Sequence, residues 1–185
     1  AEMEWLIRDM HEELKSWGYP GGADNKIIFK SDGEPAMKVV REAEAKYHGG
    51  VVVPEQSPVG ERQSNGAAEQ AGQAIRGIVR SLKDQIEYNT KEEIDPSDII
   101  MVWMIGWAAM LRNRFRLGED GKSAWERHRG RKCKIEVIPF GEKVWYKQLK
   151  GGDDKKNALE NRYQEGVWIG HDRGSNSILI GTDKG

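Results

Sequence analysis

The sequence predicts a mixed α/β fold: helices cover a sheet with parallel strands, and a small all-β module follows. Helix-like and strand-like segments alternate between residues 2 and 90, a pattern typical of sheets covered by helices. After residue 134 the chain becomes rich in Val, Ile, Trp and Tyr, broken by Gly, Asp and Asn, which indicates short strands and turns. We expect a core at 1–118, a basic linker at 119–134 and a β module at 135–185.

The N-terminal part predicts two helix–strand pairs. Apolar residues at helical spacing predict helices over 2–17 and 34–47. The short β-rich runs 26–30 and 51–53 predict strands, the second closed by Pro54. Functional groups in such sheets collect at the carboxyl ends of the strands, and Asp32 lies at one of these ends.

A long helix is predicted after the polar segment Ser57–Gly66, which has the composition of a mobile loop. One face of this helix is apolar and the other is polar. Two interpretations fit this pattern. The helix is a solvated amphipathic helix, or its polar face binds a metal ion and a polyanion that lies along it. The residues of the apolar face are Ala71, Ala74, Ile75, Ile78, Val79, Leu82 and Ile86. The residues of the polar face are Glu69, Gln73, Arg76, Arg80 and Lys83.

A further helix should begin at Asp95, as its cap, with Pro96 in the first position, and run to about Phe115. It is apolar nearly all round, so we expect it to be sandwiched in the core. Its apolar run is shorter than the roughly 20 residues that a bilayer span needs, and we expect no membrane association. Ile99–Phe115 is also where we would look for a self-association surface.

Composition sets wide limits. The chain has 185 residues, of which 37% are hydrophobic and 32% charged. The net charge of −1 predicts no partner by itself. A single cysteine, Cys133, excludes an internal disulfide framework and indicates a reducing compartment. The four histidines lack metal-ligand spacing; they are His11, His48, His128 and His171.

Cations are concentrated between Arg112 and Lys134. We expect Arg127, Arg129 and Arg131 to contact phosphates, which predicts salt-sensitive and largely sequence-independent DNA binding. A solvated linker is the alternative.

The aromatic residues of the tail have two interpretations. Trp145, Tyr146 and Trp168 are expected in the core of the β module rather than as platforms on which bases stack.

Asp32 and Glu69 should come to the same sheet edge, because one helix–strand unit separates them. Two neighbouring carboxylates repel each other unless a cation lies between them, and oxygen ligands favour Mg²⁺ or Mn²⁺. Alternatively, Asp32 caps the helix that follows it.

Two motifs resemble the integrase catalytic core of retroviral and copia-type retrotransposon polyproteins. The first is Lys-Ile-Ile-Phe-Lys-Ser-Asp-Gly over 26–33, and the second is Gln-Ser-Asn-Gly-Ala-Ala-Glu over 63–69. Looser matches are Ser-Ala-Trp-Glu from Ser123, Gly-Arg-Lys from Gly130, Phe-Gly-Glu-Lys-Val-Trp from Phe140 and Gly-Val-Trp-Ile-Gly-His from Gly166.

This resemblance implies a ribonuclease-H-like fold and metal-dependent polynucleotidyl transfer on DNA. Asp32 and Glu69 would hold Mg²⁺ or Mn²⁺, while Gln73 and Arg76 match positions that touch DNA phosphates. The tail would correspond to the small barrel after the integrase core. The family acts as a multimer, so the resemblance implies a homo-oligomer, and a nuclear location after passage through the cytoplasm.

The sequence departs from the family in its acidic residues, because the family uses three carboxylates. The first is expected on a strand upstream of residue 2, so we expect a core truncated at its N-terminus and poorly active alone. Two alternatives remain: an inactive nucleic-acid-binding remnant of an integrase, and an unrelated α/β interaction protein. In the latter, Asp32 and Glu69 would be a cap and a surface charge.

Overall fold

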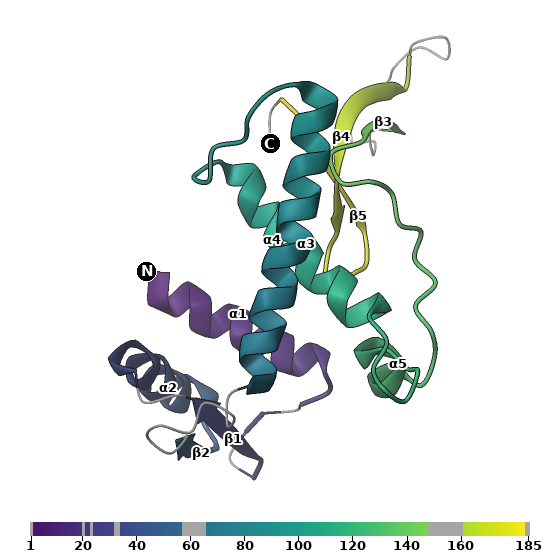
Figure 1. Cartoon of the computed structure of the whole chain (residues 1–185). Coiled ribbons are helices and arrows are strands. Elements are labelled where there is room, and N and C mark those ends of the chain that lie inside the picture. Colours follow the sequence, from purple (N-terminus) through teal and green to yellow (C-terminus); the bar gives the residue numbers. More distant parts are fainter. Residues whose placement is uncertain are drawn as a thin grey trace. The chain divides into compact units, whose positions relative to one another are not determined.

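The fold is mixed α/β, as seen in a computed structural model that describes residues 2–19, 21–22, 24–31, 34–56, 66–147 and 161–183 (Figure 1). The chain divides into two compact units, 1–72 and 73–185, and each is treated by itself. The elements of the first unit are α1 (Glu2–Ser16), β1 (Lys26–Ser31), α2 (Pro35–His48), β2 (Val51–Gln56) and the start of α3 (Gly66–Thr90). Those of the second are the rest of α3, α4 (Ile99–Phe115), α5 (Ala124–Arg129), β3 (Lys143–Lys147), β4 (Tyr163–His171) and β5 (Ile178–Gly181).

In the first unit, β1 and β2 pair in parallel, which confirms the predicted topology. The register runs from Lys26 opposite Val51 to Ser31 opposite Gln56. Pro54 does not close the second strand as expected but lies within it, opposite Phe29. Proline has no N–H to donate to the hydrogen-bond ladder between strands, and an edge strand tolerates that loss.

α2 ends at two glycines, Gly49 and Gly50. Gly49 adopts a left-handed conformation at the C-cap, with φ of 69°. Gly50 allows a close approach of two backbones, because a Cβ there would lie 2.4 Å from the carbonyl oxygen of Gly22. A larger residue at position 50 would therefore push the loop at Gly22 away from β2.

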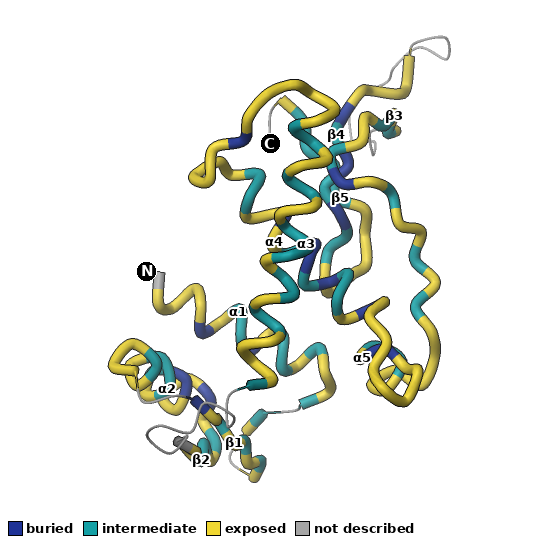
Figure 2. The backbone as a smooth tube through the Cα atoms, viewed as in Figure 1, coloured by how far each residue is buried: buried dark blue, intermediate teal, exposed yellow. Residues whose placement is uncertain are grey.

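The interior of the first unit is unusually polar. Among its described residues, Ile7 is the one fully buried hydrophobic side chain. The other buried side chains are polar or ionisable: His11, Ser31, Glu44 and His48. Figure 2 shows these dark segments on α1, β1 and α2. Apolar burial alone therefore provides little stabilisation here.

The second unit has a conventional apolar core. α4 contributes Met104 and Trp107, β4 contributes Trp168, and the segment before β3 contributes Phe140. The predicted apolar face of α3 packs against this core through Val79, Leu82 and Ile86, although these residues are only partly buried.

α4 differs from the prediction in its cap and in its exposure. Asp98, not Asp95, is the N-cap, and its carboxylate accepts a hydrogen bond from the N–H of Ile100. Asp95 instead accepts from the backbone and hydroxyl of Ser97. The helix is not sandwiched: its buried residues are Met104, Trp107, Ala108, Met110 and Arg114. Its exposed apolar residues include Ile99, Val102, Trp103 and Ile105.

The C-terminal strands form an antiparallel meander in the order β3-β4-β5. Trp168 is fully buried, as predicted, whereas Trp145 is 63% exposed, so its predicted core position is wrong. Trp145 lies on the β3 strand, whose alternate residues are exposed. The sheet shares its core with α3 and α4; that 135–185 is a module of its own, with a linker at 119–134, stays a prediction.

None of the helices that the structure describes is long and apolar enough to cross a membrane.

Candidate functional site

The carboxyl ends of β1 and β2 lie at one edge of the parallel pair. Ser31, the last residue of β1, pairs with Gln56, the last residue of β2. The segments that follow them, toward Asp32 and toward α3, therefore leave from the same edge. Asp32 itself lies outside the described residues, so its distance from Glu69 stays a prediction. Ser31 is 5% exposed, and its hydroxyl has no hydrogen-bond partner among the described residues.

The structure bears on the alternative in which Asp32 caps α2. The N-cap position is Glu34, with φ of −61° and ψ of 137°, and its own side chain makes no capping hydrogen bond. Pro35 occupies the first turn, where its missing N–H costs nothing. Asp32 precedes this position by two residues in the sequence and lies outside the described residues, so its capping role stays a prediction.

Glu69 lies in the first turn of α3 and is exposed. A carboxylate at this end of a helix is favoured by the helix dipole. Gln73, Arg76 and Arg80 follow along the same helix and are also exposed. An exposed carboxylate followed by an amide and two guanidiniums matches the polar face that the sequence predicts.

Lys83, the last residue of that face, is engaged locally. Its ammonium lies 2.7 Å from the carboxylate of Glu87, one turn later. Glu87 also accepts a hydrogen bond from the N–H of Ile94. These two donors lower the pKa of Glu87, Lys83 first, and the pairing raises the pKa of Lys83. Its charge is therefore less available to a phosphate than those of Arg76 and Arg80.

The basic segment, Arg112–Lys134, contains a capped helix and an ion pair between Arg127 and Asp120. Ser123 caps α5 by accepting a hydrogen bond from the N–H of Glu126. The guanidinium of Arg127 makes two hydrogen bonds to the carboxylate of Asp120, of 3.0 and 2.6 Å. This pairing, with a further bond from the N–H of Lys122, lowers the pKa of Asp120 to about 2.

Aromatic packing holds two more cations of this segment. The ring of Trp125 has Arg114 at 4.7 Å and Arg129 at 5.4 Å from its centroid. Arg114 is buried and donates a hydrogen bond to the side chain of Asn176, so its role is structural. Arg131 is exposed. The sequence predicts phosphate contacts for Arg127, Arg129 and Arg131. Among the described residues, Arg127 pairs with a carboxylate and Arg129 packs on an aromatic ring, whereas Arg131 shows neither contact.

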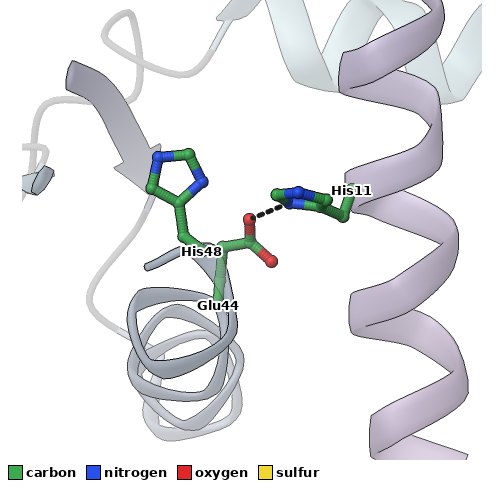
Figure 3. Close-up of side chains that lie close together, drawn as sticks. All are labelled: His11, Glu44 and His48. Atoms are coloured by element: carbon green, nitrogen blue, oxygen red, sulfur yellow. Dashed lines mark ion pairs between the residues drawn. The ribbon is translucent and has the colours of Figure 1, made fainter. Parts of the chain in front are cut away.

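The sequence prediction missed a cluster in the first unit. His11 from α1 and Glu44 and His48 from α2 bring ligand atoms within 4.8 Å of one another, and all three are buried (Figure 3). This corrects the expectation that the histidines lack the arrangement of metal ligands, since His11 and His48 meet in the fold. Glu44 and His48 are four positions apart, a spacing that places both on one helix face. That signal was present in the sequence, whereas the third member comes from another helix.

Comparisons with known proteins add little to this description of the candidate site. No protein-family model matches the chain, and none of the curated proteins matches it. Among solved structures it is similar to a chain of the cryo-EM structure of the simian T-cell lymphotropic virus intasome in complex with PP2A regulatory subunit B56 gamma. The TM-score is 0.44 and the identity 11%, over 96% of this chain and 61% of that chain. A similarity of this size carries no argument about function, and this chain spans about three fifths of that one's length.

Proposed function

We propose that this chain is a retroelement-integrase-type core of ribonuclease-H-like fold, which binds DNA and a divalent cation for polynucleotidyl transfer. The two sequence motifs support the proposal, together with the positions of their described parts, Lys30–Ser31 and Gly66–Glu69, in the first unit. The Lys-Ser-Asp-Gly motif leaves the carboxyl end of β1, next to the end of its parallel partner β2. The Gly-Ala-Ala-Glu motif opens α3. Carboxylates at these two points suit a Mg²⁺ or Mn²⁺ ion.

The residues divide into two roles in this proposal. Asp32 and Glu69 hold the ion, which when bound stabilises the charge that develops on a phosphodiester. Gln73, Arg76 and Arg80 bind the DNA backbone beside it, because they continue along α3 from Glu69 and are exposed. Arg129 and Arg131 add phosphate contacts from the basic segment, with smaller contributions from Lys83 and Arg127, which already pair with carboxylates.

The proposal extends to assembly and location. The exposed apolar residues of α4 favour a homo-oligomer, because such residues tend to be covered by a partner. An integrase acts on chromosomal DNA, so we place the protein in the nucleus after passage through the cytoplasm.

The decisive experiment measures where a divalent ion binds. Paramagnetic Mn²⁺, added below stoichiometry, should broaden the backbone amide signals of residues near Asp32 and near Glu69 together. Asp32→Asn and Glu69→Gln should each abolish the broadening at both places, because the two carboxylates share one ion. Asp84→Asn, an exposed carboxylate on the same helix, should leave it unchanged. Broadening at only one of the two positions, or broadening that survives both substitutions, would overturn the shared site.

The DNA-binding part is measured separately. Both carboxylate variants should keep the affinity of the wild type for duplex DNA within about threefold, since they remove no cation. DNA binding without any Mn²⁺ site would instead identify an inactive nucleic-acid-binding remnant. A chain that binds neither would be an unrelated α/β protein. If a third carboxylate lies upstream, joining of DNA ends by a chain extended in that direction should be lost in both variants.

A further inference from the structure

The interior of the first unit contains a cluster that the proposed DNA function does not use. His11 is 8% exposed, Glu44 is fully buried and His48 is 4% exposed. Their ligand atoms all lie within 4.8 Å of one another. Figure 3 shows the Glu44 carboxylate between the two rings, which come from different helices.

The polar atoms of this cluster lack the partners that buried groups need. Neither oxygen of Glu44 has a hydrogen-bond partner among the described residues, and the same holds for Nδ1 of His11 and Nδ1 of His48. His11 Nδ1 lies 3.7 Å from Glu44 Oε1, which is too long for a hydrogen bond. Burying a carboxylate without a partner costs free energy of folding. A ligand that contacts all of these atoms would remove that cost.

We propose that His11, Glu44 and His48 bind a zinc ion that joins α1 to α2. Two imidazole nitrogens and one carboxylate oxygen are a ligand set typical of Zn²⁺, whereas Mg²⁺ and Ca²⁺ prefer oxygen alone. The fourth ligand would be a water molecule.

The geometry is close to what zinc requires. Tetrahedral bonds of about 2.0–2.1 Å place ligand atoms roughly 3.3–3.5 Å apart. The separations within the cluster reach at most 4.8 Å, so the ligands close by at most about 1.5 Å when the ion binds. Rotation of the side chains of His11 and Glu44, which come from α1 and α2, can supply this movement.

Tyr19 supports the assignment through the second nitrogen of His48. The hydroxyl of Tyr19 lies 2.6 Å from Nε2 of His48, and the two rings stack with centroids 5.2 Å apart. If Nδ1 of His48 binds the ion, Nε2 carries the ring proton and donates a hydrogen bond to the hydroxyl oxygen of Tyr19. A hydrogen bond of this kind on the far nitrogen orients metal-binding histidines and fixes their tautomer.

The unit also needs such a cross-link. Ile7 is its one fully buried hydrophobic side chain among the described residues of 1–72. Small units with little apolar core are commonly stabilised by a structural metal. The role of the zinc ion is therefore to hold α1 against α2, which precede and follow β1 in the chain.

Zinc binding by the whole chain is the test. Metal-free protein is titrated with Zn²⁺ in competition with a chromophoric chelator. We expect one ion per chain with a dissociation constant of about 1 μM or tighter at pH 7, and a higher temperature of unfolding with Zn²⁺ present. Glu44→Gln and His48→Gln should each weaken binding at least about tenfold, and Tyr19→Phe about 10–100-fold. His128→Gln, an exposed histidine of α5, is the matched control and should bind like the wild type.

Spectroscopy provides a second readout. Co²⁺ in the same site should give the intense visible bands of tetrahedral coordination, and these should be lost in His48→Gln but kept in His128→Gln. If the Glu44 or His48 variant does not fold, Tyr19→Phe, which keeps the ligands, decides between the outcomes. Absence of stoichiometric Zn²⁺ binding by the folded wild type, or equal binding in all variants, would overturn the proposal and identify the cluster as a metal-free imidazole–carboxylate pair. Asp32→Asn should not affect Zn²⁺ binding, so this test is independent of the proposed integrase site.

Discussion

The indole of Trp107 in α4 stands edge-on to the indole of Trp168 in β4, with ring centroids 4.7 Å apart and an interplanar angle of 87°. Both residues are buried, at 3% and 0% exposed. This edge-to-face contact is the preferred geometry of two aromatic rings, and it joins the helix to the middle strand of the C-terminal sheet. Gly170 extends the contact, because a Cβ there would lie 3.2 Å from the ring of Trp107.

Trp168→Ala should lower the free energy of unfolding of the second unit by about 3–5 kcal/mol, the usual cost of removing a large buried aromatic side chain. Trp145→Ala is the control: that ring is 63% exposed, and its loss should cost less than about 0.5 kcal/mol. Urea unfolding followed by circular dichroism measures both. Similar costs in the two variants would show that Trp168 is not part of the core.

The carboxyl group of Asp120 should titrate with a midpoint at about 2, because two hydrogen bonds from Arg127 favour its charged form. A lowered pKa means that the pair stabilises the fold at pH values above the ordinary carboxyl pKa of 3.8, and that this is lost as the pH falls toward 2. In Arg127→Ala the midpoint should rise toward 3.8, whereas Arg131→Ala should leave it low. Carbon-13 NMR of the carboxyl group measures it, and an unchanged midpoint in Arg127→Ala would contradict the pairing.

Salt dependence should separate the exposed arginines Arg76, Arg80 and Arg131 from Arg127, which pairs with Asp120. In DNA binding, Arg76→Ala, Arg80→Ala and Arg131→Ala should each reduce the slope of log K against log salt by about 1, as expected for one lost phosphate contact. Arg127→Ala should reduce it less, because Asp120 already neutralises that guanidinium. Fluorescence anisotropy at several salt concentrations provides the slopes. Equal effects at Arg127 and Arg131 would show that the ion pair opens when DNA binds.

Self-association, if it uses α4, should depend on its exposed apolar residues. Val102 is 62% exposed and Ile99 71%, so Val102→Glu should reduce the mass measured by sedimentation without unfolding the chain. Val137→Glu is a suitable control, since that side chain is 49% exposed in the loop before β3. A mass that does not change in Val102→Glu, or that falls equally in both variants, would exclude this face.

Local patterns in the sequence were enough for most elements. The helices at α1, α2 and α3 and the parallel pairing of β1 with β2 follow from spacing, from glycine at the helix ends and from the alternation of elements. The prediction failed for features of α4 that depend on the surrounding structure, namely its N-cap residue and the exposure of its faces. Asp95 and Asp98 are equally good caps by composition, and only the hydrogen bond to Ile100 distinguishes them. An apolar helix can be sandwiched or half exposed, and nothing within α4 itself shows how many faces are covered.

The sequence by itself determined the order of helices and strands, the β1–β2 edge that the Lys-Ser-Asp-Gly motif leaves, and the exposed cations of α3. These depend on interactions between residues close along the chain, or on chain connections short enough to allow one topology. The tertiary structure alone decided that Trp168 is buried against Trp107 while Trp145 is exposed, and that His11 meets Glu44 and His48. Such contacts join residues far apart along the chain, and their formation depends on how helices pack rather than on the identity of any neighbour in sequence.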